Sequence, residues 1–173
     1  MSLIVEDGTG LANAESYASV AEADTYHTAR GNTGWEAVDD KEAALRKATD
    51  YMLQTYSMRW VGDRATNTQA LDWPRTDATR KNVTTGQGWY QDTYSSTIVP
   101  TEVKRACAEL ALKAATASLS EDLGPEVSAE SVSGAVSVTY AQGSRRTIKY
   151  SAVDGILMPA LKDGGSSASV VRA

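Results

Sequence analysis

The chain of 173 residues contains no phenylalanine, one cysteine and one histidine. A single cysteine excludes a disulfide within the chain, and a single histidine excludes most zinc sites. No segment approaches the ~18 apolar residues of a membrane span, and residues 1–7 lack the basic start and apolar run of a signal peptide. We therefore expect a protein that is not exported and has no membrane partner. Its aromatic packing depends on four Trp and eight Tyr.

Length and charge indicate one globular domain with an uneven surface. The formal net charge of −5 argues against an ordinary duplex-DNA binder, which usually has a basic face. Residues 1–143 have a net charge of −8 and residues 144–173 a net charge of +3. The asymmetry leaves two alternatives open: random variation of a solvated surface, or an acidic body and a basic end that meet different neighbours.

Two helices are predicted in the first third of the chain. The pattern Ser19-x-x-Glu22 is a capping box and starts the first helix. The second begins near Asp39, with Asp39-x-x-Glu42 as its cap, and continues to about residues 58–60 with apolar residues at helical spacing. A short strand is expected at residues 3–5.

Residues 61–99 have no helical period and are expected to form a long irregular loop, which includes the Thr-, Gly- and Tyr-rich residues 76–97. The third helix follows Pro100, which suits a first helical turn. Its predicted apolar stripe is Val103, Cys107, Leu110, Ala114 and Ala117, widened by Ala106, Ala111 and Ala115.

Residues 131–150 alternate with period 2 and predict a β-hairpin whose turn is residues 141–144. A fourth short helix follows Ser151 and is ended or kinked by Pro159. The predicted fold class is therefore mainly α: a small bundle of about four helices in a domain of residues 1–162, with one hairpin, a long loop, and a flexible C-terminal arm at residues 163–173.

No catalytic or metal-binding constellation is apparent. His27 has no second ligand at metal spacing, and Cys107 lies on an apolar helix stripe, where it acts as a small hydrophobic residue. The carboxylate pairs Asp39-Asp40 and Glu121-Asp122 lie at helix ends, where acids face water or a helix dipole. We expect no enzymatic activity, no cofactor and no bound metal.

A tryptophan- and arginine-rich segment is one candidate interaction site, because these residues are enriched at binding hot spots. Two roles remain open for it: a subunit interface, or a clasp within the chain. Its residues are Trp60, Arg64, Trp73, Pro74 and Arg75.

The C-terminal arm is a second candidate. A Gly/Ser hinge precedes a short β-branched segment that could order on a partner, although a frayed terminus is the simpler alternative. The segment comprises Ser169, Val170, Val171 and Arg172.

A small basic and aromatic segment is the candidate for nucleic-acid contacts, because single-stranded DNA binders combine cations with stacking aromatics. It contains Tyr140, Arg145, Arg146, Lys149 and Tyr150.

Several strings along most of the chain resemble one phage family. They include residues 3–11 (LIVEDGTGL), residues 41–45 (KEAAL), residues 59–62 (RWVG), residues 69–75 (QALDWPR) and residues 103–106 (VKRA). Each string alone is weak, but the Trp-Pro-Arg string in its context is fairly specific. The sequence is similar to tailed-phage and prophage proteins often labelled DnaT-like ssDNA-binding proteins, which in turn resemble head–tail connector (adaptor) proteins.

This resemblance implies a structural virion protein with no catalytic residues. Such adaptors form an oligomeric ring, usually a dodecamer, that binds the portal protein on one side and a stopper or tail-completion protein on the other. DNA passes through the lumen without specific binding. The implied location is the head–tail interface of the virion, and the host cytoplasm during assembly. The alternative function is that of a single-stranded DNA-binding, DnaT-like phage protein.

Overall fold

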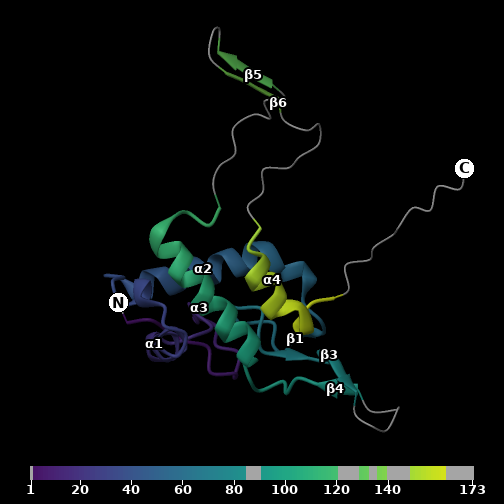
Figure 1. The fold of residues 1–173 in the computed structure, drawn as a ribbon. Coiled ribbons are helices and arrows are strands. Elements are labelled where there is room, and N and C mark those ends of the chain that lie inside the picture. Colours follow the sequence, from purple (N-terminus) through teal and green to yellow (C-terminus); the bar gives the residue numbers. More distant parts are fainter. Residues whose placement is uncertain (1, 85–90, 121–128, 133–135, 140–148, 163–173) are drawn as a thin grey trace, which may run out of the picture.

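The computed structural model describes residues 2–84, 91–120, 129–132, 136–139 and 149–162 (Figure 1). Its helices are α1 (Val20–Thr28), α2 (Lys41–Tyr56), α3 (Thr101–Thr116) and α4 (Ser151–Leu157), joined by the 3-10 turns η1 (Thr33–Trp35), η2 (Ser57–Arg59) and η3 (Met158–Ala160). Three antiparallel strand pairs accompany them: β1 (Asp63–Arg64) with β2 (Arg75–Thr76), β3 (Thr79–Thr84) with β4 (Gln91–Thr93), and β5 (Ala129–Val132) with β6 (Val136–Thr139). The fold is mainly helical, as predicted.

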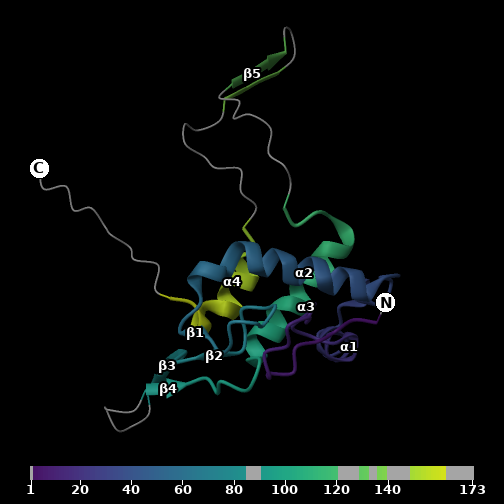
Figure 2. The same ribbon diagram turned by 180° about the vertical axis from the view of Figure 1, so that it is seen from behind.

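Helix α3 is the centre of the bundle, because α1, α2 and α4 all pack against it (Figures 1 and 2). The predicted apolar stripe is confirmed at Val103, Cys107 and Leu110, which have no accessible surface. It is wrong at Ala115 and Ala117, which are exposed. Ala117 is extended and lies beyond the helix, which ends at Thr116, whereas Ala115 lies within the helix on its exposed side.

The first helix begins as predicted, and the second begins one residue later than predicted. At α1, the Ser19 hydroxyl accepts a hydrogen bond from the Glu22 N–H at 3.2 Å, and the Glu22 carboxylate accepts one from the Ser19 N–H at 2.8 Å. At α2 the cap is Asp40, whose side chain accepts from the Ala43 N–H at 2.8 Å. Asp39 therefore lies outside the helix and is exposed.

The prediction of an irregular loop over residues 61–99 is wrong in part. Strands β1 and β2 pair with Asp63 opposite Thr76, and β3 pairs with β4 from Thr79 opposite Thr93. Strand β3 also packs against η3, close to the end of α4. Strands β1, β2 and β4, of two or three residues each, are too short to show the alternation that predicts a strand from sequence.

The predicted hairpin exists, but its position is wrong. Val132 pairs with Val136, and Ala129 pairs with Thr139, so the chain turns between residues 132 and 136. The expected turn at residues 141–144 and residues 145–148 of the expected second strand (145–150) lie outside the described residues. Lys149 and Tyr150 are described and are not part of a strand. Val132, Val136 and Val138 continue one alternation, which is why the sequence predicts a single strand through these positions.

The remaining elements follow their predictions more closely. Helix α4 follows Tyr150 and passes directly into η3, which contains Pro159. In place of a strand at residues 3–5, Val5 makes a single parallel bridge to Ser16. The arm of residues 163–173 lies outside the described residues.

The buried residues form one cluster, and its large aromatic side chains are Trp and Tyr because the chain has no phenylalanine. Trp35, Trp60, Trp73, Tyr17 and Tyr56 are all buried to within 1% of full burial. None of the described helices has both the length and the hydrophobicity that a membrane crossing requires.

Candidate functional site

The tryptophan–arginine segment folds back on the helical bundle. The Trp60 and Trp73 rings meet edge to face with centroids 5.8 Å apart, and neither has accessible surface. Tyr94 extends this aromatic stack, with its ring centroid 5.3 Å from that of Trp73. The two tryptophans are therefore closed to a partner subunit, and the geometry is that of a clasp within the chain.

Asp72 is the polar centre of this clasp, and its carboxylate is 2% exposed. Its Oδ2 accepts from the Trp60 indole Nε1 at 3.1 Å, and its Oδ1 accepts from the Ser57 hydroxyl at 3.1 Å. The Arg64 guanidinium forms an ion pair with the same carboxylate, 3.2 Å from Oδ1. The backbone N–H of Asp72 donates to the Tyr17 hydroxyl at 3.0 Å. A buried carboxylate is tolerated only with such partners, so Asp72 joins the 61–75 segment to η2 and to the N-terminal region.

Arg75 closes the same segment through backbone carbonyls. Its guanidinium donates to the carbonyl oxygens of Val61, Gly62 and Asp72 at 2.7, 2.6 and 3.1 Å. The side chain is largely buried, and burial lowers its pKa. All three nitrogens have partners inside the chain, so Arg75 acts as a backbone clamp.

Gly62 shows how tightly this clamp is built. It has φ of +66°, and a Cβ at this position would lie 2.2 Å from the Thr76 carbonyl oxygen. Only glycine fits both requirements. Of the segment's predicted site residues, Arg64 keeps the most surface, with 41% of its side chain exposed.

The N-terminal turn is organised by a buried carboxylate that the sequence pattern did not reveal. Glu6 is 1% exposed, and its two oxygens accept from the N–H groups of Gly8, Gly10 and Leu11, each at 2.9 Å. The turn therefore binds its own anion and offers no site for another. The Asp-Gly-Thr-Gly string next to Glu6 signalled the turn, but not the burial of the preceding glutamate.

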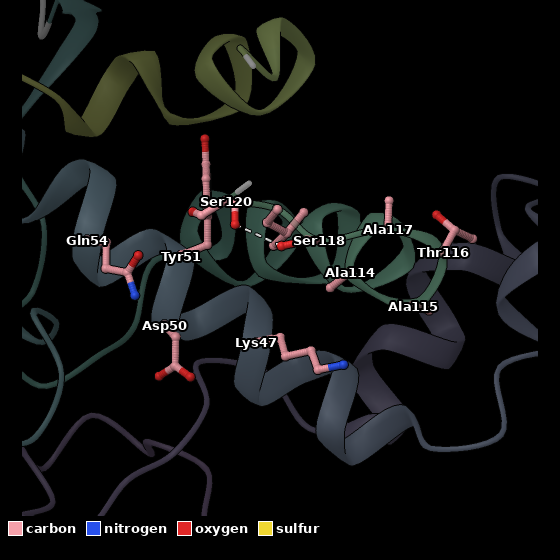
Figure 3. Close-up of a pocket in the computed structure, with 11 residues that line it drawn as sticks. Lys47, Asp50, Tyr51, Gln54, Ala114, Ala115, Thr116, Ala117, Ser118 and Ser120 are labelled. Atoms are coloured by element: carbon pink, nitrogen blue, oxygen red, sulfur yellow. Dashed lines mark hydrogen bonds between the residues drawn. The ribbon is translucent and has the colours of Figure 1, made fainter. Parts of the chain in front are cut away.

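A cavity of about 520 Å³ lies between α2 and the end of α3. Figure 3 shows Lys47, Asp50 and Gln54 along α2, opposite the final residues of α3 and the Ser118–Ser120 turn, in which the Ser118 hydroxyl donates to the Ser120 carbonyl at 2.8 Å. Tyr51 lines the cavity and packs edge to face on Tyr150, with centroids 5.4 Å apart. The charged side chains that line this cavity, Lys47 and Asp50, are both exposed. They do not indicate a particular reaction or ligand.

A second cavity, of about 280 Å³, lies in the groove between α1 and α3. Tyr26, Ala29 and Ala108 form its apolar part, and three cations surround it: Arg30, Lys104 and Arg105. We call this the α1/α3 groove. The sequence analysis did not predict it, because its residues come from the α1 region and from α3, which are far apart in the chain.

The other candidate residues lie mostly outside the described part of the chain. This applies to Ser169, Val170, Val171 and Arg172, and to Arg145 and Arg146. Lys149 is described and exposed. Tyr150 is half-buried, with Lys113 Nζ 5.8 Å from the centre of its ring. Their proposed contacts with a portal or with nucleic acid therefore remain predictions.

His27 and Cys107 are both enclosed by the core. The His27 Nε2 lies 3.1 Å from the Ala108 carbonyl oxygen, and burial lowers the pKa of the ring. Burial raises the pKa of the Cys107 thiol, so it is a poor nucleophile at neutral pH. Within the described ranges, no three His, Cys, Asp or Glu side chains gather in a way that could hold a metal ion.

A family model described as "Putative DnaT-like ssDNA binding protein" matches residues 1–173. The chain belongs to this family. No curated protein and no solved structure matches it. The match covers the clasp, the α1/α3 groove and all segments outside the described residues, so family membership does not single out one of them as the site.

Proposed function

We propose that this protein is a structural head–tail connector of a tailed bacteriophage, a subunit of a ring beneath the portal that joins the head to the tail around the DNA channel. The role requires no catalytic residue, cofactor or metal. The observation that carries the proposal is the Asp72-centred clasp: residues 69–75, the most specific string of the connector resemblance, are held by buried hydrogen bonds to Trp60 and Tyr17. A ring subunit that transmits force between head and tail needs a segment fixed in this way.

The distribution of charge on the described body also supports a channel role. Several of its cations are paired with acids of the same chain, as in Lys41–Asp24 at 2.8 Å and Arg80–Glu102 at 3.1 Å. The whole chain has a net charge of −5, and twelve copies at −5 each would carry −60. The channel of a ring with this charge would repel the phosphate backbone, so that DNA passes through it without binding.

The proposed portal contact is the C-terminal arm. Val170 and Val171 would supply apolar burial, at about 1.5–3 kcal/mol for each fully buried side chain. Arg172 would add charge-assisted hydrogen bonds. Leu161 is the last buried core residue in the described part of the chain, and the arm begins two residues later.

Co-sedimentation with portal protein tests this proposal. We expect the full chain to pellet with portal rings, and a chain lacking residues 165–173 to lose that binding while melting at the same temperature. If the truncated, folded chain binds portal undiminished, the arm is not the docking element. If the full chain does not bind portal at all, the connector function is wrong.

Single-stranded DNA binding is the second candidate, and the family description favours it. Its residues would be Arg145, Arg146 and Lys149, with Tyr140 as a stacking platform. Among the described residues, the large aromatic rings are buried or half-buried, which leaves no open platform on the body.

Fluorescence anisotropy with a labelled 30-nucleotide strand separates the two functions. The connector function predicts no sub-micromolar binding at physiological salt. Sub-micromolar, salt-dependent binding that is lost on Arg145→Ser with Arg146→Ser, but kept on Lys47→Ser, would establish the DNA-binding function instead.

A further inference from the structure

The α1/α3 groove has three cations around a small apolar floor. Arg30 and Arg105 are exposed, and neither has an acidic partner among the described residues. Lys104, at the edge, forms an ion pair with Glu22 at 2.7 Å. The groove therefore has two guanidinium groups available to an anionic partner, and guanidinium groups bind carboxylates in a two-pronged geometry.

Arg30 is already held in place for such a contact. Its guanidinium carbon lies 3.6 Å from the centre of the Tyr26 ring, and one of its nitrogens donates to the Tyr26 carbonyl oxygen at 3.0 Å. The Tyr26 hydroxyl is fixed in turn by donating to Glu109 at 2.8 Å. Less side-chain entropy is lost on binding when the cation is positioned beforehand.

The same contacts argue against a nucleic-acid strand as the occupant. A single-stranded DNA site needs an open aromatic face on which bases stack, and the Tyr26 face is covered by Arg30. Glu22 lines the groove and Glu109 accepts a hydrogen bond from the Tyr26 hydroxyl, and both carboxylates would repel a continuous row of phosphates. Separate carboxylates between short apolar side chains fit it better.

The chain presents such a segment on the other flank of α1. Residues 36–40 read Glu-Ala-Val-Asp-Asp, and Glu36, Ala37 and Asp39 are exposed. We call this the acidic loop. Neither the Glu36 nor the Asp39 carboxylate has a cationic partner within the described residues, whereas Asp40 is used as the cap of α2.

The position of the acidic loop relative to the groove follows from α1. Asp24 accepts hydrogen bonds from the Trp35 indole at 2.7 Å and from Lys41 at 2.8 Å, so the side of α1 that carries Asp24 faces the two ends of the acidic loop. Asp24 is two residues from both Glu22 and Tyr26, which line the groove. Residues two apart on a helix point to different sides. The groove and the loop therefore lie on different flanks of α1 and can engage different neighbours.

We propose that the α1/α3 groove of one subunit binds the acidic loop of the next copy of this chain, with Arg30 and Arg105 facing Glu36 and Asp39. Two complementary patches on different flanks of one subunit make a head-to-tail contact, which closes into a ring when the rotation permits. The inference rests on the ring assembly in the proposed function, and it names the contact between its subunits.

Cysteine trapping tests this contact even when self-association is weak. Ala29→Cys places a thiol in the groove, Ala37→Cys places one in the loop, and the native Cys107 is buried. Under mild oxidation, a mixture of the two variants is expected to form a disulfide-linked dimer. Ser118→Cys in place of Ala37→Cys is the matched control on an exposed site elsewhere. If the groove–loop pair gives no more dimer than this control, the proposal is wrong.

Charge exchange then tests the chemistry. Added to the trapping variants, Arg30→Glu with Arg105→Glu, or Glu36→Arg with Asp39→Arg, should each lower the dimer yield at least about tenfold, because like charges then face each other. Mixing the groove variant that carries Arg30→Glu and Arg105→Glu with the loop variant that carries Glu36→Arg and Asp39→Arg should restore the yield, because opposite charges then face each other again. Failure to restore it would overturn the proposal, as would oligonucleotide binding that depends on Arg30 and Arg105.

These outcomes are separable from those of the connector function. A trapped dimer without portal binding would leave the contact standing and remove the head–tail role. Portal binding without a trapped dimer would leave the role standing and remove this contact.

Discussion

The Trp60 indole donates a hydrogen bond to the Asp72 carboxylate at 3.1 Å, in a place where both side chains are closed to solvent. Asp72 is twelve positions after Trp60 in the chain. The hydrogen bond therefore holds the two ends of the intervening segment together. The clasp follows from this pair, with Arg75 clamping the backbone around it.

Removal of the Asp72 carboxylate should destabilise the fold strongly. Asp72→Ala leaves the Trp60 N–H buried without an acceptor and Arg64 without its acid, so we expect a loss of about 3 kcal/mol in the free energy of unfolding. Urea denaturation measures it. Arg64→Ala is the matched control, because its partly exposed side chain should cost about 1 kcal/mol or less. Equal midpoints for Asp72→Ala and the parent would contradict the clasp.

Two glycines with the same backbone angle separate strain from crowding. Gly62 and Gly31 both have φ of +66°, but a Cβ at Gly31 meets nothing within 4 Å. Gly31→Ala should cost about 1–2 kcal/mol, from the left-handed conformation alone. Gly62→Ala adds a collision with the Thr76 carbonyl and should cost clearly more. Thermal melts of the two variants make the comparison. Similar losses of stability would show that the backbone of residues 61–76 shifts easily to make room for the added methyl group.

A charge on the buried face of α3 should unfold the bundle. Val103→Asp or Leu110→Asp places a carboxylate at a position with no accessible surface and should cost several kcal/mol. Ala115→Asp, on the exposed side of the same helix, is the control and should change stability little. If Leu110→Asp melts like Ala115→Asp, α3 is not the central helix.

Stability should fall between pH 7 and pH 5 because of His27. The ring donates through Nε2 to the Ala108 carbonyl, so its Nδ1 accepts from the Asn32 amide at 3.0 Å, and protonation would break that bond. Burial lowers the pKa of His27 in the folded chain below its ordinary value of 6.5. The unfolded chain then binds the extra proton more readily, and acid favours unfolding.

Urea midpoints at pH 7 and pH 5 measure this effect, and His27→Leu provides the control. His27 is the sole histidine, so the variant should lose most of the pH dependence in this window. An unchanged slope would show that other groups are responsible.

Local signals in the sequence were sufficient for the helices. The Ser19–Glu22 capping box and the Val103–Leu110 stripe each lie within one or two turns, so neighbouring residues define them. The error at the α2 cap was one residue, since Asp39 and Asp40 are chemically alike and only the hydrogen bond to Ala43 distinguishes them.

Contacts between distant residues were what the sequence could not supply. Strands β1 and β2 pair only because Trp60, Asp72 and Arg75 draw the segment together. The α1/α3 groove depends on how two helices cross, and the charges of Arg30 and Arg105 become one surface only after that crossing. The sequence left two roles open for the Trp-Pro-Arg string, and the burial of Trp60 and Trp73 favours the clasp within the chain.

The most direct test of the account is the mass of the particle formed when this chain is mixed with portal rings, measured by native mass spectrometry. The connector function predicts a complex that carries a ring of several copies of the chain on each portal. Portal rings whose mass is unchanged by an excess of the folded chain would contradict it.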